Sequence, residues 1–73
     1  MTYYIIELDH RPDGVINSTI TARDGFANGL SLFHDRVSKG YASTQFTKVC
    51  VTVMDENNEI VRQESVGTSY AGG

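Results

Sequence analysis

The sequence has little that could cross-link a small fold. It contains one cysteine, Cys50, and one proline, Pro12, in 73 residues, and it has no tryptophan. One cysteine cannot form a disulfide within the chain, and no Cys/His spacing indicates a metal site. A chain of this length buries only about 60% of its unfolded surface, so its core is small. Small domains often gain stability from disulfides, metals or association, and association is the route left open here.

The sequence also lacks a basic stripe and a long apolar run. Six Lys and Arg residues against nine Asp and Glu residues leave a net charge of −3. This balance argues against a nucleic-acid partner held through phosphates. No apolar run approaches about 18 residues, and no basic-then-apolar start is present, so we expect no membrane span and no signal peptide. We therefore expect a cytoplasmic protein, and a lone thiol fits a reducing compartment.

Two segments near the amino terminus have the alternation of a β-hairpin. Residues 2–10 (TYYIIELDH) and 15–22 (VINSTITA) are rich in aromatic and β-branched side chains, which favour strands. Between them, a three-residue loop over Pro12–Gly14 places Arg11 opposite Val15. The resulting register, which brings apolar sets to one face, pairs Ile6 with Ile20, Leu8 with Ser18 and Tyr4 with Ala22.

The period changes to that of an amphipathic helix from Asp24 to about Gly40. The apolar stripe of this helix consists of Phe26, Leu30, Phe33 and Val37, and Tyr41 extends it. These residues recur at the spacing of one helix face, which predicts a helix packed on a sheet. We interpret Asp24 as the N-cap and Gly40 as the residue that follows the helix end.

Two further strands follow, at residues 44–55 (TQFTKVCVTVMD) and 59–66 (EIVRQESV). The first is apolar on both faces, as a central strand is, and the second is more polar, as an edge strand is. The turn between them suits a positive φ angle at Asn58. The predicted fold is therefore an α+β, β-β-α-β-β two-layer sandwich in which one helix packs on an antiparallel four-stranded sheet. It spans residues 1–67 as one domain, and we expect 68–73 to be a flexible tail.

The carboxyl-terminal AGG, Ala71 to Gly73, resembles the end of ubiquitin-like proteins and of the sulfur carriers of thiamin and molybdopterin synthesis. Those proteins also begin β-β-α, and the resemblance implies adenylation and a thiocarboxylate or isopeptide bond at Gly73. In that fold the last strand lies parallel to the first, which requires a long crossover. Here a hairpin turn precedes the last strand and predicts antiparallel pairing, so the carrier function stands as an alternative.

Residues able to carry catalysis are few. His10 lies beside the first turn, His34 borders the apolar stripe of the helix, and Cys50 lies in the middle of a strand. Nothing in the sequence indicates a helix N-terminus or a histidine close to Cys50 that would lower its pKa. A cysteine in a strand is more often a small buried hydrophobe. We expect no enzyme activity, and no cofactor.

Asp55, Asn57 and Glu59 alternate like the start of a calcium loop. Such a loop requires glycine at its sixth position and glutamate at its twelfth, where this chain has Ile60 and Val66. Turn chemistry explains the same residues, so we expect no metal site.

Several apolar residues are not used by a simple sandwich. We expect the helix to cover the sheet face that holds Tyr4, Ile6, Ile20, Val49, Val51 and Val53. The opposite face then carries Tyr3, Ile5, Phe46, Cys50 and Met54, too much apolar surface to leave in water. Leu32 lies about 120° from the helix stripe, with Gly29 and Arg36 near it, and a helical glycine lets another backbone approach closely. We predict that these eight residues form an interface with a second copy or with one protein partner.

Three stretches resemble a set of small uncharacterised proteins from Firmicutes and their phages or prophages. They are YYIIEL at 3–8, FHDRVSKGYAS at 33–43 and VTVMDENNEIV at 51–61. The shared pattern is a tyrosine-rich first strand, an aromatic-His pair in the helix, and a valine-rich strand that ends in a hairpin turn. At the position where that turn has glycine in the group, this sequence has Asn58. The resemblance implies a phage or prophage origin and a role as a virion accessory or as a small inhibitor of host machinery. If a phage encodes the protein, the expected location is the host cytoplasm.

The leading hypothesis is a non-enzymatic protein-binding module of phage or prophage type that self-associates through the open sheet face. One alternative is the Gly-Gly carrier. The other is a small inhibitor of a host defence system, such as a nuclease, that uses its acidic residues to mimic phosphates.

Overall fold

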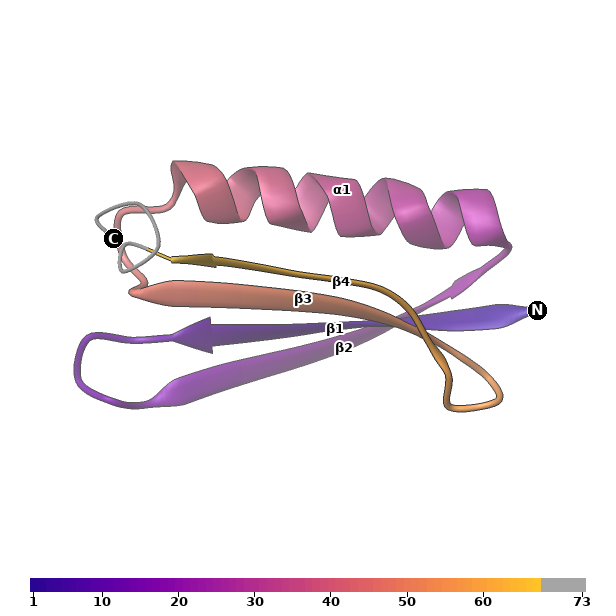
Figure 1. Ribbon diagram of the computed structural model, residues 1–73, viewed down its shortest axis with the longest axis horizontal. Helices are drawn as coiled ribbons and strands as arrows, with labels where there is room; N and C mark the ends of the chain where they lie inside the picture. The colour runs from indigo at the N-terminus through magenta and orange to yellow at the C-terminus, as the bar shows by residue number, and fades with distance from the viewer. Residues whose placement is uncertain (68–73) are drawn as a thin grey trace.

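The computed structural model describes residues 1–67, and it confirms the predicted order of elements. The elements are β1 (Thr2–His10), β2 (Ile16–Asp24), α1 (Phe26–Ala42), β3 (Lys48–Asp55) and β4 (Ile60–Gly67). The strands form one open antiparallel sheet in the order β2-β1-β3-β4, and α1 lies along one side of it (Figure 1). The predicted tail, residues 68–73, lies outside the described residues.

The first hairpin has the predicted register. The Arg11 N–H donates to the Val15 carbonyl at 2.9 Å, and Gly14 adopts a φ of 90°. A left-handed glycine at this point closes the three-residue loop without a steric penalty. Along the strands, Ile6 pairs with Ile20 and Tyr4 pairs with Ala22, as predicted.

The second hairpin turns at the predicted position. Asn58 has a φ of 64°, the only positive φ of a non-glycine residue in the described chain. The Asp55 carboxylate accepts hydrogen bonds from the N–H groups of Asn57 and Glu59 at 2.9 and 3.0 Å. This is the local bonding by which an aspartate stabilises a turn. The calcium-like alternation of the sequence is thus explained by the turn.

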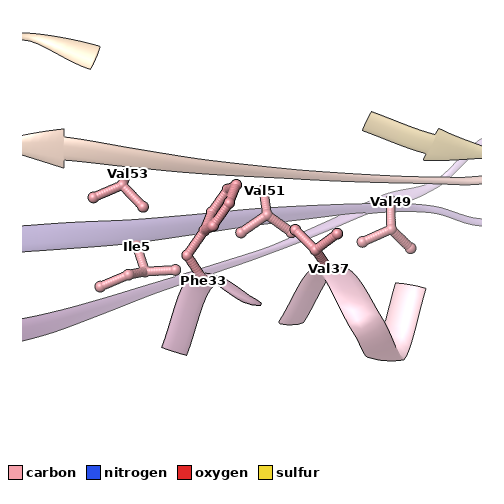
Figure 2. Close-up of a cluster of buried hydrophobic side chains, with 6 residues drawn as sticks. All are labelled: Ile5, Phe33, Val37, Val49, Val51 and Val53. Atoms are coloured by element: carbon pink, nitrogen blue, oxygen red, sulfur yellow. The ribbon is translucent and has the colours of Figure 1, made fainter. Parts of the chain in front are cut away.

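The core lies between α1 and the two central strands. Its buried side chains come from β1, β3 and the helix, and they point toward one another (Figure 2): Ile5, Phe33, Val37, Val49, Val51 and Val53. Ile5 is 0% exposed, and Val51 and Val53 are each 1% exposed. Burying such side chains stabilises the fold by about 1.5–3 kcal/mol each. Partly buried apolar residues, among them Leu30, Phe46 and Val66, pack around this set and add to it.

The predicted face of β1 is wrong. The helix covers the side that holds Tyr3 and Ile5, and not the side that holds Tyr4 and Ile6. The reason is the register between β1 and β3, which pairs Ile5 with Val53. Directly paired residues lie on the same side of a sheet, so the odd-numbered residues of β1 share the face of the core valines.

Both predicted helix ends are wrong. The N-cap is Gly25, with a φ of 88° and no side-chain cap, while Asp24 is the last residue of β2. Gly40 lies inside the helix, which continues to Ala42. Tyr41 is 67% exposed, so it does not extend the buried stripe.

Glycines at two helix positions let α1 lie close to the sheet. A Cβ atom on Gly29 would lie 3.1 Å from the Tyr3 Cβ, and one on Gly40 would lie 3.3 Å from the Val49 Cβ. Contacts this short leave little room for a side chain at either position. The helix therefore rests on β1 near its beginning and on β3 near its end. No helix within residues 1–67 is long and apolar enough to cross a membrane.

Candidate functional site

The sheet surface opposite α1 is the main candidate, and we call it the open face. No other element of residues 1–67 lies over it (Figure 1). Cross-strand pairing assigns its members, because paired residues point to the same side. The three central rows of the open face are Ala22–Tyr4–Met54–Ile60, Ile20–Ile6–Thr52–Gln63 and Ser18–Leu8–Cys50–Ser65. None of these residues carries a charge.

The charged residues of the strands lie mostly on the other side. Those that share the helix side of the sheet are Glu7, Asp9, Arg23, Asp55, Arg62 and Glu64. On the open face, charged residues occur only near the strand ends, at Asp24 and at Lys48 beside His10. An antiparallel sheet with one wet face normally places its polar residues on that face. In this sheet the charged residues have the reverse distribution, while the open face keeps uncharged polar residues such as Ser18, Thr52 and Gln63.

Several apolar side chains of the open face are in contact with solvent. Ile20 is 67% exposed, Ile60 is 57% exposed and Tyr4 is 37% exposed. Ile6 and Leu8, on the central strand β1, are half-buried by their neighbours in the sheet alone. Contiguous exposed apolar surface of this kind on a small protein marks a contact site.

The predicted interface residues divide between the two sides of the sheet. Cys50 and Met54 lie on the open face, as predicted. Tyr3 and Ile5 lie beneath the helix, where the Tyr3 ring meets the Phe26 ring edge-on at 5.7 Å between centroids. These two residues were assigned to the wrong face because the β1–β3 register was not known.

The remaining predicted interface residues also belong to the helix side. Leu32 and Phe46 pack against the core, and Gly29 is buried against Tyr3. Arg36 reaches back to the sheet, where its Nη1 lies 3.3 Å from the Glu7 Oε1. The close approach predicted at Gly29 does occur, but the sheet of the same chain makes it.

Sequence reasoning missed the main apolar residues of the open face: Tyr4, Ile6, Leu8, Ile20 and Ile60. The first hairpin register already grouped four of them on one side. The charges would have pointed to the other side, because the solvated face of an antiparallel sheet normally carries its polar residues. The odd-numbered half of β1 contains Glu7 and Asp9, which pair with the core valines of β3 and form a second, polar feature described next.

A charge cluster lies between β1 and the second half of α1. It consists of Glu7, Asp9 and Arg36, and the Glu7 and Arg36 side chains are only 16% and 22% exposed. The cluster borders a cavity of about 280 Å³, also lined by Lys39, Gly40, Ser43, Phe46 and Val49. The Asp9 Oδ1 atom is buried and has no hydrogen-bond partner among the described residues. A buried acceptor without a partner is destabilising, most of all when it is charged.

The environment of Asp9 raises the pKa of its carboxyl group from 3.8 to about 6. Burial is the largest cause, because it disfavours the charged form. The neighbouring Glu7 carboxylate raises the pKa further, while the Arg36 guanidinium acts in the opposite direction. Asp9 is therefore more easily charged in the unfolded chain than in the folded protein.

Stability should consequently fall as the pH rises through the Asp9 titration. Protonated Asp9 favours the folded state fully below pH 3.8, and this contribution is lost by about pH 6. Asp9→Asn, which stays neutral, should raise the free energy of unfolding near pH 7 by about 1 kcal/mol, allowing for solvent screening. Urea unfolding near pH 5 and near pH 7 measures this difference. Asp35→Asn on the helix surface controls for net charge, and an unchanged pH slope in Asp9→Asn would contradict the assignment.

The candidate catalytic groups are not gathered in a cavity. His10 and Cys50 lie on the open face in neighbouring cross-strand pairs, a closeness that the sequence did not indicate. The His34 ring lies edge-on to the Phe33 ring, with 5.3 Å between their centroids. Within the described residues, no group of three or more His, Cys, Asp or Glu side chains is placed to hold a metal ion.

No protein-family model, curated protein or solved structure matches this chain.

Proposed function

We propose that this protein is a non-enzymatic binding module that associates with a second copy of itself through the open face. The observation that supports this proposal is the reversed polarity of the sheet. The central rows of the open face are uncharged and partly apolar, and the strand charges turn toward the helix side. Covering the open face would remove this apolar surface from water, at about 25 cal/mol per Å².

The size of the open face suits a small dimer. The strands contain eight or nine residues each. At roughly 3.3 Å per residue and 4.8 Å between strands, the face measures about 28 by 19 Å. Its projected area of roughly 500 Å², with more in accessible surface, approaches the ~800 Å² that each partner buries in a standard interface.

A second copy is the partner that the face fits best. Most soluble oligomers are symmetric, and a two-fold contact requires one patch that complements itself. An uncharged face meets its own copy without placing like charges together, although the whole chain carries −3. A partner chosen by charge would instead require a charged face.

Tyr4→Lys tests the proposal, because it puts a charge in one of the central rows of the open face without touching the core. We expect it to weaken self-association at least about tenfold, since a desolvated charge would face its own copy. Tyr41→Lys is the matched control, because Tyr41 is an exposed tyrosine on the helix. Light scattering and sedimentation over a concentration series measure the dissociation constants. A native chain that stays monomeric, or a Tyr4→Lys chain that still dimerises normally, would refute the proposal.

Cys50 offers a second readout of the same contact. It lies in a central row of the open face and is half-buried. A contact through the open face should slow the reaction of its thiol with a labelling reagent as the protein concentration rises. The rate in Tyr4→Lys should not change with concentration.

The carrier alternative gains no support from the fold. Over residues 1–67 the sheet is entirely antiparallel, and β4 lies at its edge, beside β3 only. A carrier of the type considered would have its last strand parallel to its first. Gly73 itself lies outside the described residues, so the decisive comparison is experimental. A chain ending at Gly67 should associate like the full chain if the open face is responsible.

The host-inhibitor alternative would require an accessible acidic surface. Two of the acidic residues, Glu7 and Asp9, are instead held between the sheet and α1, and Glu7 is paired with Arg36. This placement leaves them poorly suited to mimic phosphates. The phage or prophage origin implied by the resemblance stays part of the proposal for a binding module.

A further inference from the structure

The outer edge of β2 carries few of the features that block pairing with another chain. β2 lies at the end of the sheet, has nine residues and contains neither proline nor lysine, and its two charged residues, Arg23 and Asp24, lie at its carboxyl end. Its register with β1 is continuous, and every residue except Thr21 is exposed. Natural edge strands usually carry a bulge, a proline or charges that block pairing with another chain.

The opposite edge of the sheet does carry such devices. The pairing of β4 with β3 is shifted between Val53 and Met54, as at a bulge. Arg62 and Glu64 are exposed along β4, with Gln63 between them. The contrast between the two edges points to β2 as the strand that accepts a partner.

Hydrogen bonds show which backbone groups of β2 face outward. The Arg11 N–H donates to the Val15 carbonyl, so that pair is hydrogen-bonded, and such pairs alternate along an antiparallel ladder. The His10 carbonyl accepts a hydrogen bond from the Thr47 N–H, so the even-numbered residues of β1 direct their backbone N–H and C=O groups toward β3. On β2, the odd-numbered residues therefore bond to β1. The even-numbered residues direct their N–H and C=O groups to the open edge: Ile16, Ser18, Ile20, Ala22 and Asp24. Two of these carbonyls already accept hydrogen bonds from side chains, that of Ala22 from the Arg23 Nη1 at 3.0 Å and that of Asp24 from the Asn28 Nδ2 at 2.8 Å.

We propose that β2 pairs antiparallel with β2 of a second copy, about a two-fold axis through Ile20. In this register the outward groups of Ile20 bond to those of Ile20 in the other copy. Ser18 then pairs with Ala22, and Ile16 pairs with Asp24. Every outward N–H of the strand then finds a backbone carbonyl, as it does inside a sheet. Pairing with Ser18 of the other copy replaces the Arg23 side chain at the Ala22 carbonyl.

The side chains are compatible with this register. Arg23 of one copy lies opposite Asn17 of the other, so no like charges oppose each other. Thr19 lies opposite Thr21, a pairing that stabilises antiparallel strands. The two Ile20 side chains, each 67% exposed in the single chain, meet on the open-face side. The strand is thus complementary to itself, which favours a second copy over a foreign peptide.

This contact is independent of the proposed function, since it uses backbone groups at one edge and not the open face. Because the two-fold axis is perpendicular to the sheet, both helices lie on the same side of a continuous sheet. The two open faces then adjoin, and each copy remains able to make the contact through that face.

Amide hydrogen exchange over a concentration series tests the edge contact. The amides of Ser18, Ile20 and Ala22 should exchange at least about tenfold more slowly at high concentration than at low concentration. The amides of Thr19 and Thr21 should be protected at every concentration, because they bond to β1. Equal exchange of the outward amides at all concentrations would overturn the proposal.

Two variants at Ser18 test the role of its outward N–H group, and neither changes the open face much. Ser18→Pro lacks the outward N–H, at a position where an edge strand tolerates proline, while Ser18→Ala keeps it. Ser18→Pro should abolish the concentration-dependent protection of the Ile20 and Ala22 amides, and Ser18→Ala should retain it. If these amides stay protected in Ser18→Pro, the pairing is refuted. Protected amides in β1 and β3 will show that Ser18→Pro is folded. Protection that persists in Tyr4→Lys would separate this contact from the open-face contact.

Discussion

Replacing Ile5 by alanine should lower the free energy of unfolding by about 3–4 kcal/mol. Ile5 is fully buried, and it lies among Val51, Val53 and Phe33 in the centre of the core. The loss combines the burial of the removed methyl groups with the cavity that they leave. A domain of this size has only about 4–11 kcal/mol of stability, so much of the protein would be unfolded at moderate urea concentrations.

Ile6→Ala is the matched control for this prediction. It removes the same groups one residue along the chain, but from the open face, where Ile6 is only half-buried by its neighbours. We expect a cost of about 1 kcal/mol in the single chain, in proportion to the smaller buried area. Urea unfolding followed by circular dichroism, at a concentration too low for association, measures both values. Equal losses at the two positions would mean that the helix does not select the odd-numbered face.

Arg36→Met should lower the free energy of unfolding by about 2 kcal/mol near pH 7. The substitution keeps the long apolar stem but leaves Glu7 without its ion-pair partner in a largely buried position. It also removes the positive charge that lowers the pKa of Asp9. Two adjacent carboxylates would then share a cavity with no guanidinium beside them.

The double variant Arg36→Met with Glu7→Gln provides the control for this prediction. Removing the orphaned charge should recover most of the loss, because the penalty comes from an unpaired charge and not from lost packing. The loss in Arg36→Met should also shrink as the pH falls toward 5, since Asp9 becomes protonated. Additive losses in the double variant would show that the Arg36–Glu7 pair contributes little. Urea unfolding at both pH values measures all of these differences.

Local signals in the sequence were enough to predict the elements and their turns. The loop at Pro12–Gly14 set the register of the first hairpin, and Asn58 marked the turn of the second. These features depend on the φ angles and hydrogen bonds of a few adjacent residues. The helix was likewise recognisable from the spacing of Phe33 and Val37, although its ends were not.

The helix ends were misassigned for a reason that lies outside the helix. Asp24 has the chemistry of an N-cap, but pairing with Thr2 extends β2 through it. Gly40 has the chemistry of a helix end, but the close approach of Val49 requires a small residue inside the helix. In both places a distant strand, and not the local sequence, decides the role of the residue.

The sequence by itself determined the β-β-α-β-β order, both hairpins and the existence of one amphipathic helix. Only the tertiary structure decided which face of the sheet that helix covers. Alternation within β1 separates Tyr3 and Ile5 from Tyr4 and Ile6, but both sets are apolar. The choice between them depends on the β1–β3 register, a contact between residues some 50 positions apart, such as Ile5 and Val53. That register places Ile5 in the core and leaves the open face, on which the proposed function depends, available for a partner.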